Sequence, residues 1–251
     1  MHRLTTLGIT LFASLLGPAC SMAQPSDLRR GGASADDAHE TMARNTPINV
    51  ARTLPLGRML SIEGTVTTPS GAFNSSFYDL GFAIQDRTAG IFISLPLVDT
   101  HLTVGQKVRV TGAIGDSNGL TLLVPLHPND VQVLRGKGEV KPLAVVTGNI
   151  NETTEGRLVV IHGTITQPVV ADLPYGYKLV VDDGSGAITV FINLETGIDV
   201  SQYLPEQRVH VTGFSSEYAG HYEIDPRFPA DIVVEATADQ GRVNGEGHEH
   251  H

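Results

Sequence analysis

Residues 81–95, GFAIQDRTAGIFISL, have the hydrophobic pattern of short, largely buried β-strands interrupted by a polar turn. Two short apolar runs flank the segment Asp86-Arg87-Thr88-Ala89-Gly90. Because Asp, Thr and Gly favour tight turns, this stretch predicts a β-hairpin. Residues 179–192, LVVDDGSGAITVFI, have the same arrangement of two apolar runs around a polar turn.

The two hairpins belong to a longer internal repeat. Residues 57–69, GRMLSIEGTVTTP, align without gaps with residues 156–168, GRLVVIHGTITQP. The predicted strand at 107–112 matches a second one at 208–213 in the same way. Glycine, proline and threonine recur at equivalent positions, which strand propensity alone does not explain, so the chain is predicted to contain a duplicated unit.

Each unit contains five main predicted strands, and the only plausible helix lies between the third and the fourth. This pattern predicts an all-β protein of two tandem five-stranded Greek-key barrels, the OB-fold, each with at most one short helix. In the first hairpin, alternation directs Phe82 and Ile84 inward and Gln85, Phe92 and Ser94 outward. A pair of immunoglobulin-like sandwiches is the competing architecture, but it requires about seven strands and often a core tryptophan. The chain has no tryptophan.

The repeat divides the chain into six segments. We expect a signal peptide at 1–23, a disordered tether at 24–46, a first OB-fold domain at 47–137, a linker at 138–155, a second OB-fold domain at 156–236 and a disordered, histidine-containing tail at 237–251.

The predicted signal peptide combines Arg3, an apolar run at 4–16 and the small-residue cleavage site Ser21-Met22-Ala23. It predicts export to the periplasm or the exterior. The single cysteine, Cys20, offers an alternative, because the residues before it resemble a lipoprotein processing site, although Gly17 stands where that pattern usually has leucine. Membrane attachment is expected only if Cys20 carries a lipid.

Several segments together resemble OB-fold modules of exported bacterial proteins, the type found beside secreted nucleases. They are SIEGTVT (61–67), SGAF (70–73), GFAIQDRTAGI (81–91), VGQKVRVTG (104–112) and the linker-like KPLAVV (141–146). The resemblance covers residues 47–234 and implies the fold, while it says little about the ligand. The second copy departs from it at the hairpin, with DDGSG in place of QDRTA.

Catalytic motifs are missing from the sequence. It contains neither a Gly-x-Ser-x-Gly elbow, nor a phosphate-binding glycine loop, nor a His-Glu-x-x-His metal helix. Asp182 and Asp183 are adjacent on a turn and are interpreted as turn residues. His162, His210 and His221 all fall in the second unit, with Glu223 two residues after His221, but we expect no dedicated metal site and no cofactor. The chain is therefore predicted not to be an enzyme.

The best candidate for a binding site is the outer face of the second and third strands of each barrel, with the adjoining loops. The candidate side chains are aromatic or polar, and they are Phe73, Phe77, Tyr78, Gln85, Arg87, Phe92 and Ser94 in the first unit and Tyr175, Tyr177, Lys178, Phe191 and Tyr218 in the second. The alternative is that the loop aromatics fold back and plug the ends of the barrels.

The charge limits the choice of ligand. The whole chain has a formal net charge of −10. Residues 56–137 carry six basic and six acidic side chains, whereas residues 138–235 carry five basic and fourteen acidic ones. Affinity for phosphate backbones depends on Lys and Arg, so the second unit should repel DNA. We therefore expect a binding or adaptor protein for an oligosaccharide, a peptide or a partner protein; the alternative is an accessory protein of extracellular nuclease activity that binds single-stranded DNA, weakly and through the first unit.

Overall fold

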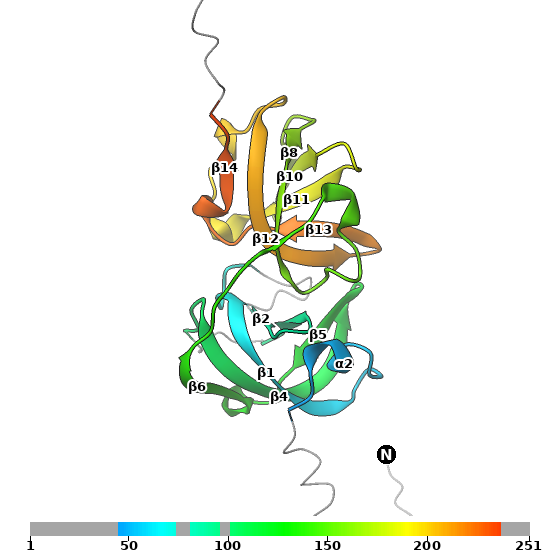
Figure 1. Cartoon of the computed structure of the whole chain (residues 1–251), viewed down its shortest axis with the longest axis vertical. Coiled ribbons are helices and arrows are strands. Elements are labelled where there is room, and N and C mark those ends of the chain that lie inside the picture. The colour runs from blue at the N-terminus through cyan, green and yellow to red at the C-terminus, as the bar shows by residue number, and fades with distance from the viewer. Residues whose placement is uncertain (1–44, 74–80, 96–100, 237–251) are drawn as a thin grey trace, which may run out of the picture.

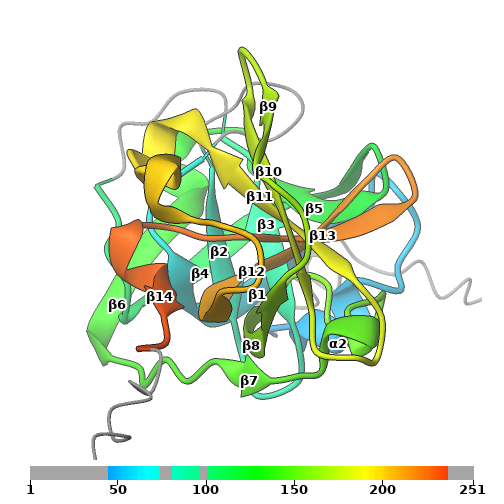
Figure 2. The ribbon, with the colours of Figure 1, turned by 90° about the horizontal axis from the view of Figure 1, so that it is seen from above.

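The computed structural model describes residues 45–73, 81–95 and 101–236, and these form two β-barrels stacked along the long axis of the molecule (Figure 1). Viewed from above, the second barrel lies over the first (Figure 2). The predicted signal peptide, residues 24–44 of the predicted tether, the tail, and Phe77 and Tyr78 lie outside the described residues. Among the described residues, no helix has the length and apolar character needed to cross a membrane.

The first barrel has the strand order β1-β2-β3-β5-β4, with β4 pairing back to β1. The β3–β5 pairing is parallel, and the other pairings around the barrel are antiparallel. This is the OB-fold topology, and β6 adds a strand at the edge of β4. The elements are α2 (Ile48–Ala51), β1 (Met59–Thr68), β2 (Phe82–Gln85), β3 (Gly90–Ile93), β4 (Gln106–Ser117), β5 (Leu120–Val124), η1 (Pro128–Asp130) and β6 (Val131–Lys137).

The second barrel repeats this topology, with the order β8-β10-β11-β13-β12, closure of β12 onto β8 and a parallel β11–β13 pair. Its elements are β7 (Leu143–Ala144), η2 (Thr147–Asn149), β8 (Leu158–Ile165), β9 (Val170–Asp172), β10 (Gly176–Asp182), β11 (Ile188–Asn193), η3 (Leu194–Thr196), η4 (Val200–Gln202), β12 (Arg208–Tyr218), β13 (His221–Asp225), η5 (Pro229–Asp231) and β14 (Ile232–Val234). The predicted fold, two tandem OB barrels, is confirmed.

Helical turns of the second barrel lie where the sequence predicts a helix, between the third and fourth barrel strands. The connection between β11 and β12 contains two 3₁₀ turns, η3 and η4, rather than a regular α-helix. In the first barrel, residues 96–100 of the corresponding connection lie outside the described residues, and the α-helix among the described residues is α2, which precedes β1. A single turn is too short to show a period of 3.6, so α2 could not be predicted from the hydrophobic pattern.

Each barrel encloses its own apolar core. The inward residues of the first hairpin, including Phe82, Ile84 and Ile91, are fully buried in the first core, as the alternation predicts. Leu179, Val181 and Val190 occupy the equivalent positions in the second core.

A third apolar cluster lies between the barrels. Phe73 and Phe92 of the first barrel pack against Phe214 of β12, with ring centroids 5.8 and 5.9 Å from it. Phe92 and Phe214 are 1% and 0% exposed. Phe92 does face away from the first core, but the expectation that it meets solvent is wrong because the second barrel covers it. Phe73 and Ser94 are likewise buried.

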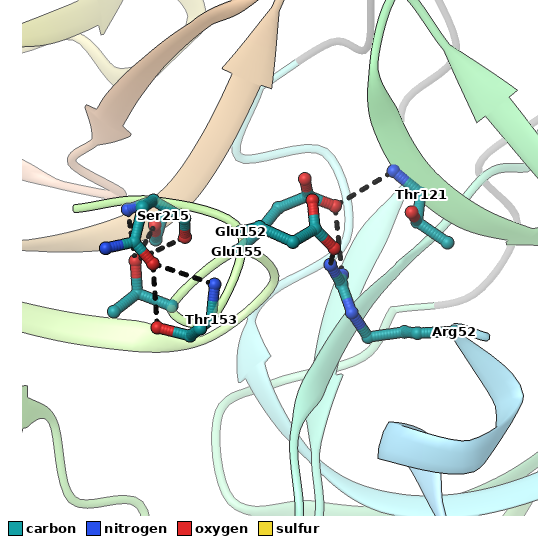
Figure 3. A network of polar contacts seen from close by, with 8 residues as sticks. Arg52, Thr121, Glu152, Thr153, Glu155 and Ser215 are labelled. Carbon is teal, nitrogen blue, oxygen red and sulfur yellow. Dashed lines mark hydrogen bonds and ion pairs between the residues drawn. The ribbon is translucent and has the colours of Figure 1, made fainter.

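Buried polar contacts also join the barrels. Arg52 of the first barrel donates to Glu155 Oε1 at 2.9 Å and to Glu152 Oε1 at 2.7 Å, and the Thr121 N–H donates to the same Glu155 oxygen at 2.9 Å (Figure 3). Elsewhere, Arg227 Nη1 donates to the Thr67 carbonyl at 2.6 Å. These contacts fix the second barrel on the first, so a site formed between them has a defined shape.

Candidate functional site: a pocket between the two barrels

A pocket of about 620 Å³ opens beside the interface between the barrels. Phe73, Phe92 and Leu120 of the first barrel form part of its apolar lining, together with Ser117. The second barrel contributes the remaining lining residues, which are mostly polar or aromatic: Asp172, Pro174, Tyr175, Lys178, Phe191, Asn193, Glu195, Ser216, Glu217, Tyr218, Glu223 and Asp225. Pockets of this size, with apolar walls and a few polar groups, are typical of small-ligand sites.

Strand alternation places the second-barrel side chains on one outer face. Leu179 of β10, Val190 of β11 and Ile224 of β13 point into the core. Their neighbours Lys178, Phe191 and Glu223 therefore point outward, and Asp225 follows two residues after Glu223. Lys178 lies opposite Phe191 in the register, and the parallel β11–β13 pair brings β13 beside them. The pocket thus uses the face of the second and third barrel strands and of the adjoining fifth.

Two carboxyl groups on this face have strongly perturbed acidity. Burial raises the pKa of Glu223 to about 7, while Lys178 opposes the shift and Asp172 adds to it. Burial, followed by the neighbouring Glu223 carboxylate, raises the pKa of Asp225 well above its usual range, although a hydrogen bond from Ser216 works against this. Near neutral pH the pair therefore retains protons, and it offers hydroxyl donors as well as acceptor oxygens.

Two buried acceptor atoms of the pocket residues have no hydrogen-bond partner among the described residues. They are Asn193 Oδ1 and Asp225 Oδ1. A buried acceptor without a donor costs free energy, about 1–3 kcal/mol for a neutral group. Both residues line the pocket, so a ligand hydroxyl or amine could supply the missing donors.

Six of the predicted ligand-binding residues line this pocket, and four of them belong to the second barrel. Tyr175, Lys178, Phe191 and Tyr218 all line it. Tyr175 and Tyr218 are 50% and 53% exposed, so a ligand in the pocket can reach their rings. Lys178 forms an ion pair with Asp172, with 2.7 Å between Lys178 Nζ and Asp172 Oδ2.

The remaining predicted residues have other positions. Tyr177 packs against the second core, and Gln85 accepts a hydrogen bond from the Leu158 N–H at 3.2 Å, so Gln85 is part of the contact between the barrels. Phe73 and Phe92 reach the pocket only as part of its buried wall. Arg87 lies in a different groove, described below.

Sequence reasoning missed Asn193 and Asp225, and it considered Glu223 only as a partner of His221. The available signal was the segment Glu223-Ile224-Asp225, in which two acids flank a core residue of a strand. Alternation places both acids on one outer face, but it does not reveal that another domain buries that face. Among the described residues, the His221–Glu223 pair is not part of any three-residue group with metal-ligand spacing.

A second groove, of about 700 Å³, runs along the first barrel. Its basic side chains are Arg87, Lys107, Lys141 and Arg157. Its acids are already engaged: Glu63 pairs with Arg109, Glu139 pairs with Lys141, and Asp86 accepts backbone N–H groups. Arg157 donates to the Thr88 carbonyl.

No family model and no curated protein matches this chain. Several solved structures are similar. A murine DNA-binding protein bound to double-stranded DNA has a TM-score of 0.37 and 9% identity, with 71% of this chain and 98% of that chain covered. Fission yeast Pot1 with single-stranded DNA has a TM-score of 0.36 and 11% identity, covering 78% of this chain and 90% of that one. The p202 HIN1 domain with a 12-mer double-stranded DNA has a TM-score of 0.34 and 12% identity, with 74% of this chain and 98% of that chain covered. Similarity of this extent carries no argument about the ligand, which has to be derived from the side chains.

Proposed function

We propose that this chain is a non-catalytic binding protein that holds an oligosaccharide in the pocket between its two barrels. The observation that carries the proposal is the combination, in one pocket, of exposed aromatic rings with buried acceptors that lack donors. OB-folds use this strand face and its loops to bind oligosaccharides as well as oligonucleotides.

The aromatic side chains supply flat apolar surfaces. Tyr175 and Tyr218 are about half exposed, and Phe191 stands between Lys178 and the acids of β13. A tyrosine or phenylalanine ring buries a large apolar area at a small entropic cost, and tyrosine adds a hydroxyl group. Such rings can cover the apolar face of a sugar ring while polar neighbours contact its edge.

The polar side chains suit a ligand that both donates and accepts hydrogen bonds. Asn193 Oδ1 and Asp225 Oδ1 require donors. The raised pKa of Glu223, caused mainly by burial, leaves a carboxylic acid hydroxyl available near neutral pH. Sugar hydroxyls, like those of serine, are simultaneously donors and acceptors.

Charge argues against a phosphate-bearing ligand in this pocket. Besides the protonated pair Glu223 and Asp225, three further acids line it, Asp172, Glu195 and Glu217, against the single basic residue Lys178. A phosphodiester carries negative charge and offers no donor to the unpartnered oxygens. A neutral saccharide meets neither difficulty.

The test is a glycan-array screen with the whole chain, followed by calorimetric titration of the best saccharide. We expect Phe191→Ala and Glu223→Gln each to weaken binding at least tenfold, and Lys107→Gln, which lies in the other groove, to leave it unchanged. The saccharide should be recovered intact after long incubation. Retained affinity in both pocket variants, or cleavage of the saccharide, would contradict the proposal.

Single-stranded nucleic acid is the second candidate ligand, at the groove of the first barrel. Arg87 and Lys107 line this groove, and neither forms an ion pair with another described residue. Of the acids in the groove, Glu63 and Glu139 pair with other cations, and Asp86 accepts backbone N–H groups. Two unengaged cations can contact a phosphate backbone, with weak and salt-dependent affinity.

Fluorescence anisotropy with single-stranded DNA at low and moderate salt tests this second function. Binding should weaken steeply with salt and should be reduced in Arg87→Gln/Lys107→Gln, whereas Glu223→Gln should have no effect. The pocket variant is thus the control for nucleic-acid binding, and the groove variant is the control for saccharide binding. Absence of binding at low salt would remove the nucleic-acid function.

We also propose that the protein acts outside the cytoplasm, a proposal that rests only on residues 1–23. Mass spectrometry of the mature protein distinguishes cleavage after Ala23 from lipidation at Cys20.

A further inference from the structure

A pair of histidines faces outward from the second barrel, away from any role in the pocket. His162 of β8 lies directly opposite His210 of β12 in the antiparallel register. Their ring centroids are 3.8 Å apart, with an angle of 56° between the ring planes. Directly opposite residues on one face of an antiparallel pair project side by side, so this closeness is fixed by two paired backbones.

A carboxylate completes the group. Glu235 follows β14, and its backbone N–H donates to the Arg208 carbonyl at 2.9 Å, which holds it beside β12. Glu235 Oε1 lies 2.8 Å from His210 Nε2. One ligand atom from each of His162, His210 and Glu235 lies within 4.8 Å of the other two.

We propose that His162, His210 and Glu235 form a binding site for a divalent transition-metal ion of the zinc class. Two imidazole nitrogens and one carboxylate oxygen are a donor set that Zn²⁺ accepts, with bonds of about 2.0–2.2 Å. Such bonds place neighbouring ligand atoms about 3.3 Å apart in tetrahedral geometry. Small side-chain rotations would bring the three ligand atoms, now within 4.8 Å of one another, to this separation. Imidazole ligands favour Zn²⁺, Cu²⁺ or Ni²⁺ over Mg²⁺ and Ca²⁺.

The surroundings support this assignment. His162 is exposed, and the side chains of His210 and Glu235 are 44% and 33% exposed, so an ion can enter from solvent and retain water in the fourth position. Arg208 Nε donates to the other Glu235 oxygen, Oε2, at 3.1 Å. This contact can orient the carboxylate while Oε1 binds the ion, as outer hydrogen bonds do in known metal sites.

Arg208 is also a cation in direct contact with the group, through its ion pair with Glu235. Its side chain is 67% exposed, so water screens its repulsion of an incoming ion. The bound ion would connect β8, β12 and the end of β14. It should therefore stabilise the folded second barrel, since an ion that binds only the native state raises the melting temperature.

The inference is independent of the ligand proposed for the pocket, and it is tested with Zn²⁺ and Ni²⁺ alone. Because His248, His250 and His251 could bind metal by themselves, all titrations use the full chain with these three residues changed to alanine. Calorimetry should detect one ion bound per chain.

In this background, His162→Ala and His210→Ala should each weaken the affinity at least tenfold and abolish the metal-induced rise in melting temperature. His221→Ala, another strand histidine of the second barrel, should do neither. His162→Gln provides a second variant if the alanine proteins unfold, and circular dichroism without metal checks the fold. The proposal would be overturned if the chain with the three tail histidines changed to alanine bound no metal. Unchanged metal affinity in His162→Gln would also overturn it.

Discussion

The Asp86 carboxylate accepts the backbone N–H of Ile48, the first residue of α2, at 3.0 Å. The same carboxylate accepts the N–H groups of Thr88 and Ala89 within its own turn, at 2.7 and 2.9 Å. In the second barrel Asp183 repeats the arrangement, accepting the Thr147 N–H at 3.1 Å and the Ser185 N–H at 2.9 Å. The repeated hairpin motif therefore clamps each barrel's leading segment to its second and third strands.

Replacing Asp86 with alanine should lower the free energy of unfolding by about 1–2 kcal/mol, because the carboxylate satisfies N–H groups at the start of α2 and in the turn. Urea denaturation of the whole chain measures the loss. Asp116→Ala is the matched control, since the hydrogen bond that Asp116 accepts from the Gly119 N–H is long, 3.4 Å. A loss no larger than that of the control would show that the clamp contributes nothing.

The same carboxylates predict acid sensitivity. Burial by itself would raise the pKa of Asp86, but hydrogen bonds from Ile48, Thr88 and Ala89 outweigh it and hold that pKa below 3.8. Hydrogen bonds from the Ser185 and Thr147 hydroxyls hold the pKa of Asp183 far below the same value.

A carboxyl group with a lowered native pKa stabilises the fold above its unfolded pKa, and that stability is lost as the pH falls through the native value. Wild-type stability should therefore decrease from about pH 5 towards pH 2. The decrease should be shallower in Asp86→Asn/Asp183→Asn, measured as urea midpoints at each pH. Parallel curves for the two proteins would refute this assignment.

Glu223 predicts the opposite dependence at higher pH. Its native pKa of about 7 exceeds the ordinary glutamate value of 4.5, so the folded state holds a proton that the unfolded chain has released. Stability should therefore fall as the pH rises from about 4.5 to about 7, on the order of 2 kcal/mol from this group. Glu223→Gln should remove that component, seen as the wild-type minus variant difference in unfolding free energy at pH 5 and pH 8. An equal difference at both pH values would contradict the perturbed acidity.

Phe214→Ala should destabilise the protein by about 3–5 kcal/mol, because the ring is fully buried against Phe73 and Phe92 between the barrels. Phe191→Ala is the control, since its partly exposed ring lies on the pocket face and its loss should affect ligand binding more than stability. Denaturant unfolding compares the two. If both variants lowered the unfolding free energy by similar amounts, the Phe214 cluster between the barrels would contribute no more to stability than the pocket face does.

Arg227→Met should cost about 3–5 kcal/mol, because it leaves the buried Asp231 carboxylate without its charged partner. It also removes the donor to the Thr67 carbonyl of the first barrel. Arg208→Met, whose side chain is 67% exposed in its pair with Glu235, should cost less than about 1 kcal/mol. Thermal unfolding of the metal-free proteins provides the comparison.

The duplication and the OB topology could be predicted because they depend on local signals. Strand alternation, turn residues and the match between residues 57–69 and 156–168 are visible in one dimension. The sequence predicts that Asp86 and Asp183 stabilise their own turns. It does not predict their contacts with Ile48 and Thr147, because these residues lie 38 and 36 positions earlier in the chain.

The site depended on tertiary structure, because alternation assigns a residue to a face without saying what covers that face. Phe92 and Phe191 both point outward from their barrels. Phe92 is buried against Phe214, whereas Phe191 lines the pocket with a partly exposed ring. Asp225 also lies on an outer strand face, yet it is buried and its Oδ1 has no donor among the described residues. Local sequence patterns specify two barrels with inner and outer faces. The packing of one barrel on the other then determines whether an outward residue such as Phe92 is buried or, like Phe191, can contact a ligand.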